Sequence, residues 1–246
     1  MDRHTTNPAR GAQDDFLREL VALKCEERIP GAMRFFKTGK GQYGEGDLFW
    51  GISVPKQQAL SRKYYKAIEL HDYSQLLKHS VHEVRLSALM MLVYRYQSSK
   101  PEREEVVNLY RAHFDYVNNW DLVDTSAAKI LGEWLWEKDH QELKTLALSG
   151  HLWRQRISII ATHAFIRRGY FTTTLELSEL LLHHPHDLIH KAVGWMLREV
   201  GNIDFQAEYA FLKQHYQTMP RTMLRYAIEK FDEPLRQDFL KGRINP

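Results

Sequence analysis

The chain has 246 residues, of which 43% are hydrophobic, and its 34 lysines and arginines outnumber its 31 acidic residues to give a net charge of +3. This composition suits a globular protein with a sizeable core. The few glycines and prolines disfavour a turn-rich all-β fold, and a single cysteine excludes an internal disulfide. No apolar run approaches the roughly 18 residues that span a bilayer, and the polar N-terminus lacks a signal-peptide core. We therefore expect a cytoplasmic protein with no membrane contact.

Apolar residues recur at helical spacing along most of the chain. The first such segment covers residues 14–27, where Phe16, Leu20 and Leu23 share a face. Further helices are expected over residues 83–96, 102–114, 121–137, 140–148, 153–167, 174–182, 187–199, 205–216 and 221–231. Since strand-like alternation is missing, the sequence predicts an all-α fold. We expect a flexible tail over residues 1–13 and a single repeat domain over residues 14–246.

One stretch departs from the helical pattern. Residues 39–51 are glycine-rich, but they lack the spacing and the flanking strand of a phosphate loop or a dinucleotide fingerprint. We expect this stretch to join the first helices to the repeats, with Phe49 and Trp50 anchored in the core.

The later part of the chain repeats itself. Arg85, Arg156, Lys191 and Arg225 each open a segment that runs into an apolar helix, and the last three are spaced by 35 and 34 residues. The gap from Arg85 to Arg156 is about twice as long, and the segment opening with Asp124 fills it. Such an interval is typical of a two-helix unit, so the sequence predicts an α-solenoid of HEAT-like repeats.

In such a solenoid the second helices line a concave face, so equivalent side chains form a ladder along it. The four bases would then make a basic stripe with a pitch of about 10 Å, which suits the phosphates of a duplex. The alternative is that each base bonds to carbonyls or acids of the preceding repeat. One acid among four bases suggests a site in which the bases hold a polyanion and a carboxylate performs chemistry.

Tryptophans accompany this ladder at short offsets. Trp120 lies four residues before Asp124, Trp195 lies four residues after Lys191, and Trp153 lies three before the base of its own segment. Residues four apart share one side of a helix, so ring and charge can face one cleft; the alternative for each ring is core packing.

The role of the acid also has an alternative. Asp124 could cap a helix, although Asp121 competes for that position. Among bases, the Asp124 carboxylate would stay ionised. An ionised carboxylate suits stabilisation of a cation or positioning of a water, and it does not suit proton donation.

Metal chemistry is not expected. The densest group of histidines is His183, His184, His186 and His190, whose spacing fits no metal-ligand signature and is interrupted by Pro185. We expect neither a metal nor another cofactor.

Three strings together resemble the AlkD-type DNA alkylation repair family: Asn119-Trp-Asp-Leu-Val-Asp124, Trp153-Arg-Gln-Arg156, and Lys191-Ala-Val-Gly-Trp-Met-Leu-Arg-Glu199. The segments 33–37 and 43–55 resemble the entrance of that family. The resemblance runs from about residue 20 to residue 232, and the motifs are specific in combination although each is weak alone.

The resemblance implies a solenoid that wraps duplex DNA on its concave face. It implies a monofunctional glycosylase that releases cationic alkylated purines, such as 3-methyladenine and 7-methylguanine, by gripping the backbone rather than by using a base pocket. Carried over by motif, Trp120 and Trp195 would pack against the deoxyribose, Asp124 would be the catalytic carboxylate, and Arg156 would hold the adjacent phosphate.

The DNA contacts expected from the ladder and the resemblance together are Arg156, Arg85, Lys191, Arg198, Arg225, Phe35 and Trp153. Phe35 stands where the family can have tyrosine, so a hydrogen bond from that hydroxyl is missing here. The partner would be duplex DNA with alkylated bases, bound by a monomer. The alternative is a non-catalytic solenoid that binds damaged or branched DNA, or a protein partner.

Overall fold

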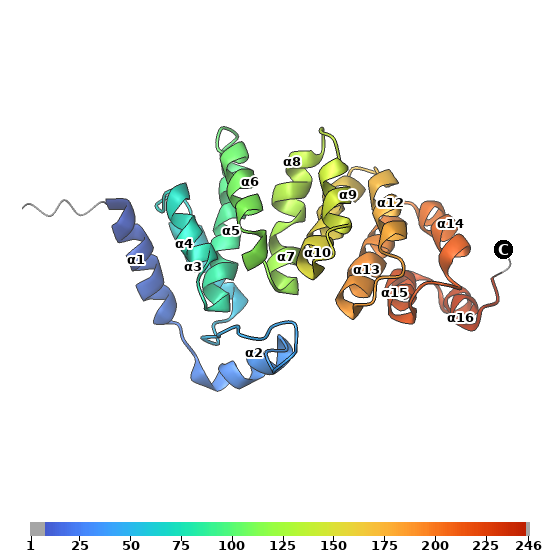
Figure 1. Ribbon diagram of the computed structural model, residues 1–246, viewed down its shortest axis with the longest axis horizontal. Helices are drawn as coiled ribbons and strands as arrows, with labels where there is room; N and C mark the ends of the chain where they lie inside the picture. The colour runs from blue at the N-terminus through green and yellow to red at the C-terminus, as the bar shows by residue number, and fades with distance from the viewer. Residues whose placement is uncertain (1–7, 245–246) are drawn as a thin grey trace, which may run out of the picture. The chain divides into compact units, whose positions relative to one another are not determined.

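The computed structural model describes residues 8–244, and these residues form an all-α protein built from packed helix pairs, as predicted (Figure 1). Within this range no strand occurs, and Leu48 and Val81 form an isolated bridge. The chain divides into two compact units, an N-terminal unit that ends at Ser126 and a C-terminal unit that begins at Ala127. No helix between residues 8 and 244 has the length and apolar character needed to cross a membrane.

The N-terminal unit contains seven α-helices and three short 3₁₀ turns within the described residues. They are α1 (Pro8–Val21), η1 (Glu26–Arg28), α2 (Ile29–Phe35), α3 (Val54–Tyr64), η2 (Leu70–Asp72), α4 (Tyr73–Leu77), α5 (His82–Ser98), α6 (Arg103–Ala112), η3 (Phe114–Tyr116) and α7 (Trp120–Ser126). The first helix begins at Pro8 rather than at residue 14, and residues 1–7 of the expected tail lie outside the described residues. Helices α2, α3 and α4 are absent from the sequence-based expectations.

Helix α5 is the centre of the N-terminal unit. It packs against α3, α4, α6 and α7, and 14 of its 17 residues are buried. Helices that are covered on all sides lose the usual polar stripe. The first turns of α5 nevertheless carry His82, Glu83 and Arg85, all buried. Buried charges require partners, and the partners of these three side chains organise the site described below.

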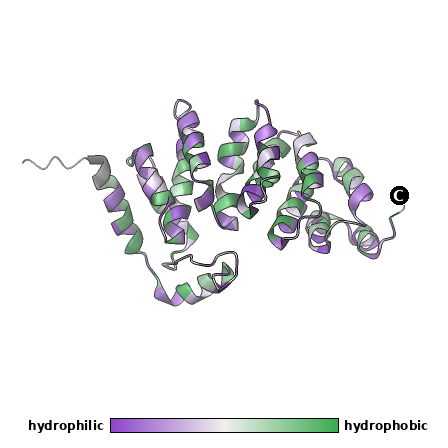
Figure 2. Ribbon diagram, viewed as in Figure 1, coloured by the Kyte–Doolittle hydropathy of each residue, from purple (hydrophilic) through white to green (hydrophobic). Residues whose placement is uncertain are grey.

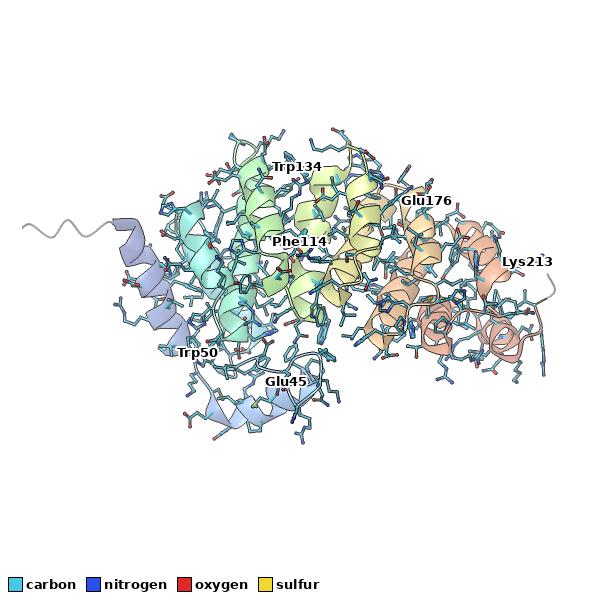
Figure 3. The ribbon with its side chains drawn as sticks, viewed as in Figure 1. Glu45, Trp50, Phe114, Trp134, Glu176 and Lys213 are labelled. Atoms are coloured by element: carbon cyan, nitrogen blue, oxygen red, sulfur yellow. The ribbon has the colours of Figure 1, made fainter. Side chains whose placement is uncertain are left out.

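The glycine-rich stretch connects α2 to α3, as expected, and lies with α2 at one end of α3 and α5 (Figure 1). Its residues Glu45 and Trp50 are labelled in Figure 3. The backbone of Leu48 accepts from the N–H of His82 and donates to Ser80. Phe49 is buried, which confirms its role as an anchor, whereas Trp50 is half-buried.

The C-terminal unit continues the chain with η4 (Ala128–Gly132), α8 (Glu133–Leu135), α9 (Gln141–Ala147), α10 (Leu152–Ala161), α11 (His163–Ile166), α12 (Thr172–Leu180), α13 (Asp187–Ile203), α14 (Phe205–His215), α15 (Arg221–Ala227), η5 (Ile228–Lys230) and α16 (Glu233–Lys241). The helix expected over residues 121–137 appears as α7, η4 and α8 in succession. Segment η4 is a π turn, in which the N–H of Gly132 donates to the carbonyl of Ala127.

Within the C-terminal unit the second helices of successive pairs pack on one another. Helix α10 contacts α13, and α13 contacts α15, while α9 and α12 cover their partners. Hydrophobic and hydrophilic residues alternate along these helices, as their amphipathic packing requires (Figure 2).

Two glycines permit this close stacking. A Cβ on Gly194 would lie 2.4 Å from the carbonyl oxygen of Met223 in α15, and one on Gly132 would lie 2.1 Å from that of Ala161 in α10. Both distances are far below van der Waals contact, so any larger residue must push the neighbouring helix away.

Glu208 in α14 is a buried acid that gives a testable pH dependence. It is 2% exposed, its Oε2 lies over Gly201 of α13, and its Oε1 has no hydrogen-bond partner among the described residues. Burial raises the pKa of Glu208 from 4.5 to about 8, and the charge of Arg198 opposes this rise only in part. The folded protein therefore holds a proton that the unfolded chain releases above pH 4.5.

Between pH 4.5 and 8 the wild type should lose stability, because the unfolded state ionises freely and the folded state does not. Glu208→Gln removes this titration and should raise the free energy of unfolding by about 2–4 kcal/mol at pH 9, with the gain disappearing near pH 4.5. Urea melts at a series of pH values measure the difference. Glu179→Gln, at an exposed position of α12, is the control and should show no such trend; a parallel trend in both variants would contradict the assignment.

Candidate functional site

The helix boundaries place four of the five charged ladder residues at the same helical position. Asp124, Arg156, Lys191 and Arg225 are each the fifth residue of their helix, in α7, α10, α13 and α15 respectively. Arg85 is the fourth residue of α5. The register inferred from the sequence repeat therefore holds at the level of helical position, although the surroundings of the five side chains differ.

Trp120 and Asp124 form one edge of α7. Trp120 is the first residue of the helix, and its backbone N–H donates to Oδ1 of the buried Asn119 at 2.9 Å. Asp124 follows four residues later, so its side chain lies one turn along the same side. Both residues are half-buried. Since α7 begins at Trp120, Asp124 is inside the helix and the capping alternative for it is wrong.

A stack of rings holds Trp120 from the side of the glycine-rich connector. The Phe36 ring stacks on the Trp120 ring with centroids 5.5 Å apart and planes 22° apart. Phe36 also contacts the rings of His82 at 4.8 Å and Phe49 at 5.2 Å. Phe35 meets the edge of the Trp120 ring at 5.5 Å. The sequence singled out Phe35, but Phe36 makes the stacked contact.

An ionic network lies behind this stack. Nδ1 of His82 is 3.1 Å from Asp47, and its Nε2 is 2.8 Å from Asp121, the residue that follows Trp120. Arg85 donates from Nη2 to Asp47 at 2.6 Å and to Asn118 at 3.1 Å. The network thus joins the connector, the start of α5 and the start of α7. Its contacts span more than 30 residues of sequence, so no local spacing could reveal them.

The charges in this network stabilise one another. Burial alone would lower the pKa of His82, but the carboxylates of Asp121 and Asp47 outweigh burial and raise that pKa to about 9. Burial would raise the pKa of Asp47, and the hydrogen bonds and charges of His82 and Arg85 lower it instead. His82 is therefore a cation at neutral pH, and it fixes Asp121 and so the first turn of α7.

The guanidinium of Arg85 is buried and is bonded to other groups of the protein. It is 4% exposed, and besides Asp47 and Asn118 its Nη1 donates to the carbonyls of His79 and Ser80. Arg85 thus bonds to carbonyls and to an acid that precede it in the chain, as the alternative for the ladder bases expects. The expectation of a DNA phosphate on Arg85 is not supported by this placement.

Two further residues of the predicted DNA surface, Arg156 and Trp153 in the C-terminal unit, are also buried. Arg156 is 4% exposed, and its Nη1 donates to the carbonyl of Leu188 in α13 at 2.6 Å. Trp153 is buried in the same helix. The bond from Arg156 links α10 to α13, and a contact of either side chain with DNA stays a prediction.

Three further cations of this unit remain nearer to solvent. Lys191 is half-buried and pairs with Asp187 one turn earlier, 2.7 Å away. Arg225 is exposed on α15. Arg198 is tied to Glu199 and to Glu229 of η5 by ion pairs, which gives it a role in joining α13 to η5.

Trp195 is half-buried on α13 and is oriented by a hydrogen bond. Its Nε1–H donates to Oε1 of Glu199 at 2.9 Å, and its ring lies 6.1 Å from that of His163. Burial and the nearby charge of Arg167 lower the pKa of His163. The spacing of four residues between Trp195 and Glu199 is a signal that the sequence analysis could have used.

The histidines before α13 have local partners. Nδ1 of His184 accepts from the N–H of His186, and Nδ1 of His186 accepts from the N–H of Leu188 at the start of the helix. Across residues 8–244, no three histidine, cysteine or acidic side chains are grouped so that they could hold a metal ion.

Comparison with known proteins finds one family model and three solved chains that match. The family model described as “DNA alkylation repair enzyme” matches residues 16–231. A solved structure named “Predicted DNA alkylation repair enzyme from Enterococcus faecalis” aligns with a TM-score of 0.66 and 20% sequence identity, over 85% of this chain and 97% of that chain. At this identity the likeness shows the fold alone. No curated protein matches the chain.

Proposed function

Because the chain belongs to the DNA alkylation repair enzyme family, we propose that it is a monofunctional DNA glycosylase that releases cationic alkylated purines, such as 3-methyladenine and 7-methylguanine, from duplex DNA. Membership of the family supports a role in the repair of alkylation damage. The choice of glycosylase chemistry rests on a single observation, which is the half-buried carboxylate of Asp124 one helical turn from the half-buried ring of Trp120.

The proposed chemistry follows from the charge of the substrate. A purine alkylated at N3 or N7 is already cationic, so it departs without protonation and leaves an oxocarbenium-like sugar. The ionised carboxylate of Asp124 would stabilise that sugar and position the attacking water, and the face of Trp120 would favour the cation by about 1 kcal/mol. Trp195 would serve the same purpose. No metal or other cofactor is required for these steps.

The ionic network supports this proposal through pre-organisation. An electrostatic catalyst acts best when its charge is fixed before the reaction begins. His82 holds Asp121 at 2.8 Å, and Phe36 contacts the rings of both His82 and Trp120. The start of α7 is therefore constrained on two sides, which would keep Asp124 in place without a contribution from the DNA.

The direct test is an assay of base release from methylated duplex DNA without added metal, with the released bases separated chemically. We expect 3-methyladenine and 7-methylguanine to appear and neutral purines to remain bound to the sugar. Duplex binding without any base release would instead favour the non-catalytic solenoid.

The DNA contacts are best tested on the exposed ladder cation. Arg225→Ala should weaken duplex binding and reduce the slope of log K against log salt by about 0.9, the value for one phosphate contact. Its melting temperature should stay unchanged, because Arg225 is exposed. Titrations at several salt concentrations give the slope.

Lys213 provides the matched control, because it is exposed on α14, the helix that precedes α15 in the same unit (Figure 3). Lys213→Ala removes the same charge and should leave the slope as in the wild type. Equal slopes for the wild type and Arg225→Ala would remove Arg225 from the DNA surface.

A further inference from the structure

The C-terminal unit carries a second group of cations, further along its helices than the ladder. Lys129 lies in η4, and His163 opens α11, seven residues or about two helical turns after Arg156. Helix α11 packs on both η4 and α13. The ring of Trp195 in α13 lies 6.1 Å from that of His163. Successive segments of this unit therefore bring a lysine, a histidine and a tryptophan to one place.

Arg167, the residue that follows α11, adds a third cation. It pairs with Oε1 of Glu133 at 2.8 Å, but the same carboxylate also accepts from Arg168 at 2.6 Å. One negative charge thus serves two guanidinium groups. Lys129 is exposed, and its ammonium has no ion pair among residues 8–244. The side of the group formed by η4 and α11 therefore has an excess of positive charge.

The acid on the α13 side is already bonded within its own helix. Glu199 accepts from three donors of α13, which are Nε1 of Trp195 at 2.9 Å, Arg198 at 3.4 Å and Asn202 at 3.2 Å. Among the described residues no ion pair joins this carboxylate to Lys129. Glu199 therefore leaves the excess positive charge in place.

The half-buried imidazole of His163 has bonding capacity to spare. Neither ring nitrogen is bonded to another residue between 8 and 244, and neither is sealed from solvent. Burial and the charges of Arg167 and Lys129 lower the pKa of His163, and Glu199 opposes them in part. Helices α10 and α12 also pack on α11, but their described residues add no charge that acts on this ring. His163 is therefore mostly neutral at pH 7 in the free protein.

Lys129 responds to the same neighbour. Partial desolvation and the charge of Arg167 lower the pKa of Lys129. An anion placed among such cations relieves their mutual repulsion and favours their charged forms. The ammonium, the imidazole and the guanidinium all donate well to phosphate oxygens. A phosphate is thus the ligand that this group of side chains fits.

We propose that Lys129, His163 and Arg167 bind a phosphate of duplex DNA, and that His163 takes up a proton from solution when the phosphate binds. The ring of Trp195 borders these side chains, and the proposed function places that ring against a deoxyribose, to which a phosphate is bonded. The proposal therefore rests on the DNA partner of the proposed function. It does not depend on base release.

Proton uptake makes the binding of DNA depend on pH. A phosphate beside His163 raises its pKa from the lowered value of the free protein. The affinity is then constant below the free pKa, which lies under 6.5. It falls as the pH rises from there to the bound pKa, by at most about tenfold per pH unit, and is constant again above the bound pKa.

The first experiment measures proton uptake with the whole chain and an undamaged duplex. Titration calorimetry at pH 7, in buffers that differ in ionisation enthalpy, gives the protons taken up per bound protein. We expect the wild type to take up roughly 0.3 to 1 proton more than His163→Gln. His71→Gln is the control, because the side chain of His71 is 70% exposed in the N-terminal unit. It should take up as many protons as the wild type.

A permanently charged variant separates a phosphate ligand from a purely structural residue. His163→Arg needs no proton to bind phosphate, so at pH 8 it should bind the duplex at least about threefold more tightly than His163→Gln. Lys129→Ala should reduce the slope of log K against log salt by about 0.9. Lys213→Ala, at an exposed position of α14, should keep the wild-type slope. Melting temperatures of all variants should match the wild type.

The proposal is overturned if His163→Gln takes up as many protons as the wild type, or if Lys129→Ala keeps the wild-type salt slope. If His163→Gln does not fold, His163→Arg takes its place in the same comparison. Sodium pyrophosphate is titrated in parallel. Proton uptake with pyrophosphate and none with the duplex would assign these side chains to a free phosphate and overturn the contact with DNA.

The base-release assay on the same proteins separates this proposal from the proposed function. Base release together with equal proton uptake by wild type and His163→Gln overturns the phosphate site alone. Proton-linked binding of the duplex without base release overturns the glycosylase alone. A wild type that binds no duplex overturns both.

Discussion

Replacing Asp124 by asparagine is expected to slow the release of 3-methyladenine from methylated duplex DNA by at least about tenfold. A unit charge about 4 Å from the developing cation, at an effective dielectric constant of about 20, contributes roughly 4 kcal/mol. This sets an upper limit of about a thousandfold in rate. Asparagine keeps the shape of the side chain and removes the charge, so the effect should fall on single-turnover rates rather than on the affinity for DNA.

The control for this variant is Asp115→Asn. Asp115 is exposed in η3, shortly before α7, so the substitution removes the same charge from the same unit without touching the proposed site. Melting temperatures should agree among the three proteins. Equal release rates for Asp124→Asn and the wild type would end the assignment of Asp124 as the catalytic carboxylate.

Replacing Arg85 by alanine is expected to lower the free energy of unfolding by about 3–5 kcal/mol. The guanidinium donates to two backbone carbonyls, to Asn118 and to Asp47. Its removal leaves the buried Asp47 carboxylate with His82 as its one remaining side-chain partner among the described residues. Breaking a buried ion pair by removing one partner typically costs this much. Urea denaturation at pH 7 measures the change.

Arg85→Lys and Arg225→Ala complete this test. Lysine cannot reproduce the planar, forked donation of Arg85 and should recover only part of the lost stability. Arg225→Ala should unfold as the wild type, because the side chain is exposed. If Arg85→Ala unfolds as the wild type and loses DNA affinity instead, the structural role assigned to Arg85 is wrong.

The sequence was informative where periodicity and position decide structure. The helices predicted over residues 187–199 and 83–96 appear as α13 and α5 with small extensions, because long amphipathic or apolar runs leave few alternatives. The equivalence of Asp124 with three of the four bases was recognised from spacing alone. The interval between these residues along the chain is enough to predict that each occupies the same position in its helix.

The spacing of the ladder residues could not predict which of their side chains are buried. Arg156 and Lys191 occupy the same helical position, yet one is buried against the carbonyl of Leu188 and the other is half-buried beside Asp187. The difference depends on which acceptor the next repeat supplies, and that is decided by packing. Helices α3 and α4 were missed for a related reason, since packing on α5 rather than strong periodicity stabilises them. Helix α2 has no buried residue that a hydrophobic pattern could have marked.

The close approach at Gly132 and Gly194 has a consequence for the growth of the C-terminal unit. In a repeat stack each helix is placed by the one before it, so a displacement at one junction is inherited by all later helices. A side chain at Gly194 would shift α15 and, with it, η5 and α16 further along the chain. Two residues without side chains thus set the step between neighbouring repeats, and single substitutions there would alter pitch as well as local packing.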